Sequence, residues 1–154
     1  MLANAPVALE GYMNFSAALA RGTLDAGMRE QIAITVAESN LCAYCSSAHA
    51  LLAEKLGLSQ QEISDAMRAT AAALKNDAVL KPARSIVVQR GEFSNTDIQR
   101  ARAGGLTDGE ILETAASVAP NIFANYVSHI ARTVVDFPGG EPVRRRRTRP
   151  GDTQ

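Results

Sequence analysis

The chain has 154 residues, enough for one domain with a buried core, and its 16 basic residues balance its 16 acidic residues. Five arginines follow residue 140, so the remaining body is mildly acidic, with 11 basic and 14 acidic residues, which argues against a nucleic-acid-binding surface. No stretch approaches the roughly 18 apolar residues of a membrane span, and no basic segment precedes an apolar run at the start, so we expect a cytoplasmic protein without a signal peptide.

The first half of the chain is predicted to form four helices. The first covers about residues 6–20 and the second about 25–39. The third opens at the Cys-x-x-Cys segment and ends near Gly57, a residue type that favours the left-handed end of a helix. Ser59 followed by Glu62 is a capping-box pattern, which predicts a fourth helix over about 60–71.

Two further helices are expected next, the second of them short. A fifth spans about residues 76–90, and Pro82 either bends it or marks its start. Thr96 with Gln99 repeats the capping-box pattern and predicts a sixth helix that ends at Gly104.

The last helical segment is predicted over about residues 107–137. Thr107 with Glu110 forms a third capping-box pattern at its start. Pro120 is expected to split or kink this segment, because proline lacks the N–H that a helix interior needs. Since no sustained strand pattern occurs, the chain is predicted to be a single all-α domain of about six to eight helices.

Residues 139–154 differ in composition from the rest of the chain. They contain Gly, Pro and five arginines with little apolar content, which predicts a disordered Arg-rich tail. We expect a solvated terminus here rather than a segment that binds nucleic acid or membrane.

The only two cysteines lie three residues apart, and His49 follows four residues after the second. On a helix, Cys42, Cys45 and His49 fall within an arc of about 60°. Cys45 lies within the predicted apolar stripe, whereas Cys42 lies at its edge, nearer solvent. The leucines that define this stripe are Leu41, Leu52 and Leu56.

The surroundings of Cys45 decide whether it can react. A thiol in apolar surroundings is inert unless a neighbour accepts its proton, and His49 is one helical turn away. Glu30 lies on an apolar stripe of the second helix, where an unpaired carboxylate would be costly, so it needs a partner. A proton relay from Glu30 through His49 to Cys45 would satisfy both requirements.

Two other interpretations of the cysteine pair remain open. The cysteines could simply pack in the core, or zinc could take Cys42, Cys45 and His49 as ligands. A structural zinc site needs a fourth ligand, for which only His129 is left, so we expect no metal and no cofactor. His129 is predicted to be a hydrogen-bonded histidine at a helix or subunit contact, with Asn125 as its partner.

The spacing of Glu30, Cys42, Cys45 and His49 resembles the Glu-x(11)-Cys-x-x-Cys-x-x-x-His signature of the alkylhydroperoxidase-D-like family. That family belongs to the carboxymuconolactone decarboxylase superfamily. The segment "NYVSHIARTVVDFP" also resembles the C-terminal segment of many members, so the likeness covers roughly residues 3–138. It implies an all-helical fold that forms trimers or hexamers, and a thiol-dependent hydroperoxide reductase.

The resemblance also implies a role for each site residue. Cys45 would be the peroxidatic thiol and Cys42 the resolving thiol, with Glu30 and His49 as the proton relay. Tyr44 stands where the best-known member has a histidine, so it is at most an auxiliary hydroxyl donor.

The partners that the resemblance implies are a hydroperoxide substrate and an external dithiol, either thioredoxin-like or lipoyl. Two alternatives stay open. One is a non-redox decarboxylase or isomerase of the same superfamily that uses Glu30 and His49 as acid and base. The other is a metal-binding or structural helical module.

Overall fold

The structure, a computed structural model, describes residues 2–136, which form one short 3-10 helix and seven α-helices without a strand. The predicted all-α class is therefore confirmed for this part of the chain, and the predicted tail lies outside the described residues. The elements are η1 (Leu2–Asn4), α1 (Pro6–Leu19), α2 (Ala26–Ser39), α3 (Ala43–Lys55), α4 (Gln60–Met67), α5 (Leu74–Val88), α6 (Asn95–Ala103) and α7 (Asp108–Ala131).

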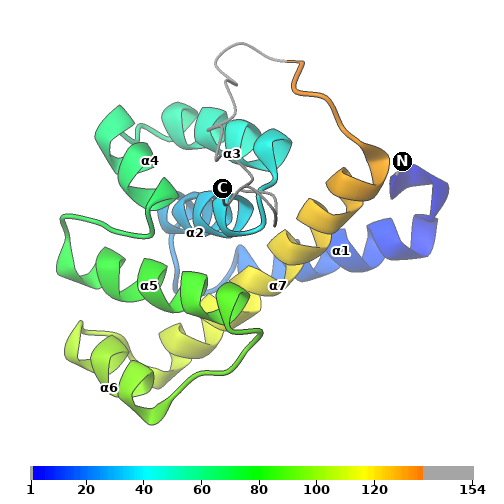
Figure 1. Ribbon diagram of the computed structural model, residues 1–154. Helices are drawn as coiled ribbons and strands as arrows, with labels where there is room; N and C mark the ends of the chain where they lie inside the picture. Colours follow the sequence, from blue (N-terminus) through cyan, green and yellow to red (C-terminus); the bar gives the residue numbers. More distant parts are fainter. Residues whose placement is uncertain (1, 137–154) are drawn as a thin grey trace, which may run out of the picture.

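Helix α2 is the centre of the fold and packs against α3, α4, α5 and α7 (Figure 1). All seven residues from Gln31 to Ala37 are buried, so this part of α2 is enclosed on every side. Burial on every side places this stretch of α2 in the core. The neighbouring helices complete this core with Ile63, Val79, Leu80 and Val118. Side chains on α2 are consequently held rigidly, which matters for the site described below.

The predicted start of the sixth helix is wrong by two residues. Helix α6 begins after Ser94, not after Thr96, and Ser94 forms a complete capping box with Asp97. The Asp97 carboxylate accepts hydrogen bonds from the backbone N–H and the hydroxyl of Ser94. Serine and aspartate therefore satisfy the helix start earlier in the chain. The capping boxes predicted from Ser59 and from Thr107 are confirmed.

Neither proline in a helix interior divides its helix. Helix α7 runs without a break through Pro120, so of the predicted split or kink the split is wrong, and α5 begins at Leu74, so Pro82 does not mark its start. The Asn121 side chain donates a hydrogen bond to the carbonyl oxygen of Ser117 at 2.9 Å, next to the position where Pro120 supplies no N–H. The helix continues through the proline because tertiary packing overrides the local cost of the missing bond.

Several helices end on a left-handed residue that is not glycine. Helix α4 stops at Met67, four residues earlier than predicted, because Ala69 has a φ of 56°. The Thr70 N–H then bonds to the Asp65 carbonyl at 3.0 Å, which closes the helix end. The other residues of this kind are Leu41, Arg90 and Arg132.

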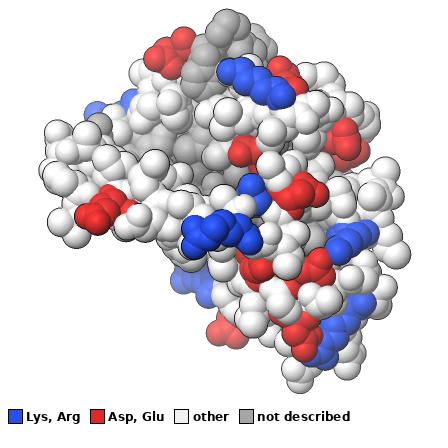
Figure 2. Space-filling model, turned by 180° about the vertical axis from the view of Figure 1, so that it is seen from behind, with Lys and Arg blue, Asp and Glu red and all other residues white. Residues whose placement is uncertain are grey.

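Acidic and basic side chains are interspersed on the face seen from behind (Figure 2). On that face, red and blue groups alternate over the helices and do not separate into large areas of one sign. Among residues 2–136, every helix is too short or too polar to cross a membrane.

Acid is expected to weaken the fold through Glu110. Its carboxylate lies 2.6 Å from the Lys75 ammonium. The hydrogen bonds that this carboxylate accepts from Lys75 and from the Thr107 N–H lower the pKa of Glu110 to about 2. A lowered carboxyl pKa stabilises the fold above the ordinary value of 4.5, and this stabilisation is lost as the pH falls from 4.5 toward 2. Because Lys75 is largely exposed, we expect a loss of about 1–2 kcal/mol.

Urea unfolding of the wild type and Glu110→Gln at several pH values measures this contribution. The difference in free energy of unfolding between the two proteins should be largest near pH 7 and should shrink as the pH approaches 2. A difference that stays constant over that range would contradict the prediction.

Candidate active site

The two cysteines lie where α2 turns into α3. They form a disulfide, with their Cα atoms 5.4 Å apart. Leu41 adopts the left-handed conformation, with a φ of 58°, so that the Cys42 N–H bonds back to the carbonyl oxygen of Ala37 at 2.9 Å. Cys42 thus becomes the N-cap of α3, and its Sγ accepts a hydrogen bond from the Cys45 N–H at 3.4 Å.

The sequence predicted that Cys42 would be the more solvent-exposed of the two cysteines, and this prediction is wrong. Cys42 is 2% exposed, whereas Cys45 is 6% exposed. The prediction assumed that Cys42 is a residue of the helix itself. Cys42 instead precedes α3 as its N-cap, and its N–H bonds back to the end of α2. Both cysteines are therefore buried.

The predicted apolar stripe of α3 is also wrong. Its leucines point outward and are exposed by 44 to 63%; they are Leu41, Leu52 and Leu56. The side of α3 that faces the core carries small side chains instead, namely Cys45, Ser46 and Ala53. Small residues let α3 approach α2 closely, which places the cysteine pair against the central helix.

Glu30 and His49 form the contact that the sequence predicted. Glu30 Oε2 of α2 lies 2.7 Å from His49 Nδ1 of α3, and both side chains are about one-fifth exposed. Glu30 is thus paired, as its place on an apolar stripe requires. Cys45 precedes His49 by one turn of the same helix, so the acid, the imidazole and the thiol follow one another along the α2–α3 hairpin.

A second contact of this kind was missed from the sequence. The Ser46 hydroxyl, which is buried directly after Cys45, donates a hydrogen bond to Glu38 Oε1 at 2.5 Å. The signal was present in the short turn between the two helices, because residues at similar distances on either side of such a turn meet across the hairpin. Two carboxylates of α2 therefore hold α3 in register beside the cysteines.

A cavity of about 300 Å³ lies beside Cys42. Tyr44 lines it from the first turn of α3, and His129 lines it from the last turn of α7. The structure therefore brings both predicted auxiliary residues next to Cys42 and not next to the Glu30–His49 pair. The cavity gives a small molecule access to the surroundings of Cys42.

Asn125 does not pair with His129, contrary to the prediction. Its Oδ1 accepts a hydrogen bond from Asn40 Nδ2 at 2.9 Å, and Asn125 is fully buried. Because Asn40 ends α2, this bond ties the middle of α7 to the turn that carries Cys42. His129, one helical turn further on, is left facing the cavity.

The chemistry available at the site follows from these contacts. Two thiols can alternate between dithiol and disulfide, and a carboxylate–imidazole pair can move a proton. Within residues 2–136, no three His, Cys, Asp or Glu side chains are grouped so that they could hold a metal ion.

Comparison with protein families and curated proteins gives one match. The model of the carboxymuconolactone decarboxylase family matches residues 6–86, more than half of the chain, including Glu30, both cysteines and His49. No curated protein matches the chain.

Solved structures with similar folds come from several bacteria. An uncharacterised peroxidase-related protein from Silicibacter sp. TM1040 has a TM-score of 0.74 and 21% identity, with 82% of this chain and 69% of that chain covered. A protein of unknown function from Agrobacterium tumefaciens, suggested to be the antioxidant defence protein AhpD, has a TM-score of 0.76 and 18% identity over 85% and 92%. An uncharacterised peroxidase-related protein from Ralstonia eutropha JMP134, described as an alkylhydroperoxidase AhpD core, has a TM-score of 0.73 and 25% identity over 84% and 70%.

Proposed function

The chain belongs to the carboxymuconolactone decarboxylase family, and from this premise we propose that it is a thiol-dependent hydroperoxide reductase of the alkylhydroperoxidase-D type. The observation that carries the proposal is the Glu30–His49 contact of 2.7 Å, on the same helical hairpin as the Cys42–Cys45 disulfide. A disulfide pair beside an acid–imidazole pair has what peroxide reduction requires, namely a thiol, a base and a second thiol.

The proposed cycle starts from the dithiol. The Cys45 thiolate attacks the hydroperoxide, so that an S–O bond forms, the O–O bond breaks and an alcohol leaves after taking a proton. The Cys42 thiol then displaces water from the Cys45 sulfenic acid, which gives the disulfide seen in the structure. An external dithiol reduces this disulfide and is itself oxidised.

Glu30 fixes the histidine tautomer in this proposal. An ionised carboxylate can only accept hydrogen bonds, so His49 Nδ1 donates to Glu30 Oε2 and Nε2 is left as the base for the Cys45 proton. The same nitrogen can later return that proton to the leaving alcohol.

Glu30→Gln is expected to slow the oxidation of Cys45 by about 10–100-fold, because the amide orients His49 less well and does not stabilise the imidazolium. Glu38→Gln is the matched control: it alters the other glutamate of α2, whose partner is Ser46, and should change the rate less than about threefold. Since the chain has no tryptophan, rapid quenching followed by thiol alkylation and mass spectrometry measures the rate. Equal effects of the two variants would contradict the relay.

The function itself is tested with reduced protein and cumene hydroperoxide. One peroxide should be consumed for each disulfide formed, and turnover should continue only with a dithiol present. Protein whose thiols have been alkylated beforehand is the control and should consume none. Equal consumption by reduced and alkylated protein would overturn the proposal, and a decarboxylase or isomerase activity that survives alkylation would support the non-redox alternative.

The reductant is proposed to meet the disulfide at Cys42. Cys42 borders the cavity of about 300 Å³, whereas Cys45 does not line it. A cavity of this size suits a small or lipoyl-like dithiol better than a broad protein surface. Because such a cycle needs a supply of reduced dithiol, we place the protein in a reducing compartment, the cytoplasm.

The protein is also proposed to form a trimer or hexamer of identical chains. Helix α1 contains no buried residue and packs mainly against α7, although it carries the largely exposed apolar side chains of Val7, Met13 and Phe15. Leu52 of α3 and the flanking Leu41 and Leu56 are further exposed apolar side chains. Surfaces of this kind on a helix usually mark a protein contact, and a second copy of the chain would cover them.

Light scattering after size exclusion should give three or six times the 16.3 kDa chain mass. Phe15→Asp, in the middle of α1, should shift the population toward the monomer, because it places a charge within the apolar contact. Val88→Asp, at an exposed valine that ends α5, is the matched control and should leave the mass unchanged. A wild-type mass of one chain at all concentrations would contradict the proposed assembly.

A further inference from the structure

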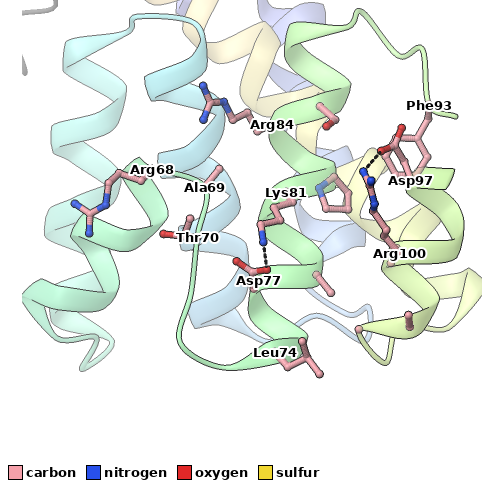
Figure 3. Close-up of a pocket in the computed structure, with 16 residues that line it drawn as sticks. Arg68, Ala69, Thr70, Leu74, Asp77, Lys81, Arg84, Phe93, Asp97 and Arg100 are labelled. Atoms are coloured by element: carbon pink, nitrogen blue, oxygen red, sulfur yellow. Dashed lines mark hydrogen bonds and ion pairs between the residues drawn. The ribbon is translucent and has the colours of Figure 1, made fainter.

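We propose that a cavity over α5 is a second binding site, for a small ligand that joins a carboxylate to an apolar body. The cavity has a volume of about 610 Å³ and lies between the end of α4, α5 and α6 (Figure 3). This volume falls within the range of small-molecule sites. None of the residues of the candidate active site lines it.

The cavity wall carries more positive than negative side chains. Its cationic residues are Arg68, Lys81, Arg84 and Arg100, against two acidic residues, Asp77 and Asp97. Figure 3 shows Arg68 at the end of α4, Lys81 and Arg84 on α5, and Arg100 across the cavity on α6. The wall therefore favours an anionic ligand.

Both carboxylates of the wall already have partners. Asp77 Oδ2 lies 2.5 Å from the Lys81 ammonium. Asp97 accepts two hydrogen bonds from Ser94, from the hydroxyl at 2.6 Å and from the backbone at 3.1 Å, and these bonds lower its pKa. The Arg100 guanidinium approaches Asp97 only to 3.9 Å. Arg68 also has a partner, Asp65, at 2.5 Å, so the cation of the wall that these pairs leave is Arg84.

Arg84 is the cation of the cavity wall that has no acidic partner among the described residues. Among residues 2–136, its side chain makes no hydrogen bond or ion pair. The sequence explains why, because the positions three and four residues away on α5 hold no acidic side chain; they are Leu80, Lys81, Val87 and Val88. Instead, Lys81 lies one turn before Arg84 on the same face, so two positive groups border the cavity together. A ligand carboxylate could accept two hydrogen bonds from the Arg84 guanidinium.

The cavity wall also contains apolar residues. Phe93 is half-buried there, and Pro82 and Ala101 are buried in its lining. Gly104 lets α6 lie directly against α5, since a Cβ on Gly104 would come within 2.2 Å of the Ala78 Cβ. The ligand would place its carboxylate at Arg84 and Lys81 and its apolar part toward Phe93. A lining with both a guanidinium that is free within residues 2–136 and apolar side chains selects an amphipathic acid over a fully polar anion.

The probes are 4-phenylbutyrate and the neutral 4-phenylbutan-1-ol, titrated at low salt and followed by amide chemical shifts and calorimetry. The acid should bind about tenfold more tightly than the alcohol, with shifts confined to residues 68–70, 81–85 and 93–101. Arg84→Gln should weaken binding of the acid about five- to tenfold, and Arg84→Lys should lose less. Lys55→Gln, which removes an exposed charge on α3 outside the cavity, should bind like the wild type.

Several results would overturn the site. They are equal affinity for the acid and the alcohol, shifts outside the cavity, equal losses in Arg84→Gln and Lys55→Gln, or no binding of the acid at about 10 mM. The amide spectra of the unliganded variants show whether each one is folded, so a loss of structure is distinguished from a loss of binding. Peroxide consumption is not part of the test, and its outcome therefore does not depend on the proposed function.

Discussion

Cys45→Ser is expected to lower the rate of hydroperoxide consumption by at least about 10³-fold, because a serine hydroxyl cannot replace the thiolate as the nucleophile. Cys42→Ser should behave differently. Its Cys45 should still react with one equivalent of peroxide at close to the wild-type rate, but no disulfide can form, so the protein should stop as a sulfenic acid after one turnover.

Trapping with dimedone after rapid quenching identifies the oxidised cysteine. The adduct should appear at Cys45 in Cys42→Ser and should be absent from Cys45→Ser. Ser46→Ala is a matched control, because it removes the neighbouring hydroxyl but keeps both thiols, and it should form the disulfide as the wild type does. The opposite pattern would give the peroxidatic role to Cys42. That outcome has a physical basis, since Cys42 caps α3 and a helix N-terminus favours a thiolate.

Gly104→Ala is expected to lower the free energy of unfolding by about 2–3 kcal/mol. Gly104 has an ordinary φ of −78°, so the backbone accepts alanine, but the new Cβ would lie 2.2 Å from the Ala78 Cβ and would force α5 and α6 apart. Gly109→Ala is the matched control. The nearest atom to its new Cβ is Thr107 Oγ1 at 3.8 Å, so the better helix propensity of alanine should leave the stability unchanged or raise it by up to about 1 kcal/mol.

Urea unfolding of the two variants and the wild type measures both effects. For a chain of this length, the Gly104→Ala loss corresponds to a fall in melting temperature of about 4–12 °C. Equal stabilities of the two variants would show that the close approach of α5 and α6 adjusts without penalty.

Local patterns predicted most of the helices, although at α6 the Ser94–Asp97 box prevails over the Thr96–Gln99 pattern. The Ser59–Glu62 and Thr107–Glu110 boxes are such patterns, and both are present. The errors arose where tertiary packing overrides local preference. Pro120 stays within a continuous helix, and Ala69 ends α4 in a conformation that alanine seldom adopts.

The candidate site divides in the same way. The Glu30–His49 contact was predictable, because a charged residue on an apolar stripe needs a partner and the hairpin offered one. The Asn40–Asn125 bond joins residues 85 positions apart, and no local pattern indicates it. The burial of Cys42 was not predictable either, since it depends on Leu41 adopting a left-handed conformation that sequence preferences assign to glycine.

The left-handed residues have a consequence for engineering a more durable protein. A non-glycine residue in this conformation is disfavoured by roughly 1 kcal/mol, so glycine at the exposed Arg90 offers a route to stabilisation away from the cysteines. Leu41 is the position to leave unchanged. Its apolar side chain points outward at the border of the Cys42 cavity. Leu41→Gly would stabilise the turn but would remove a side chain that an incoming molecule contacts. Durability and access to the reactive sulfur atoms thus impose opposite demands on a single residue.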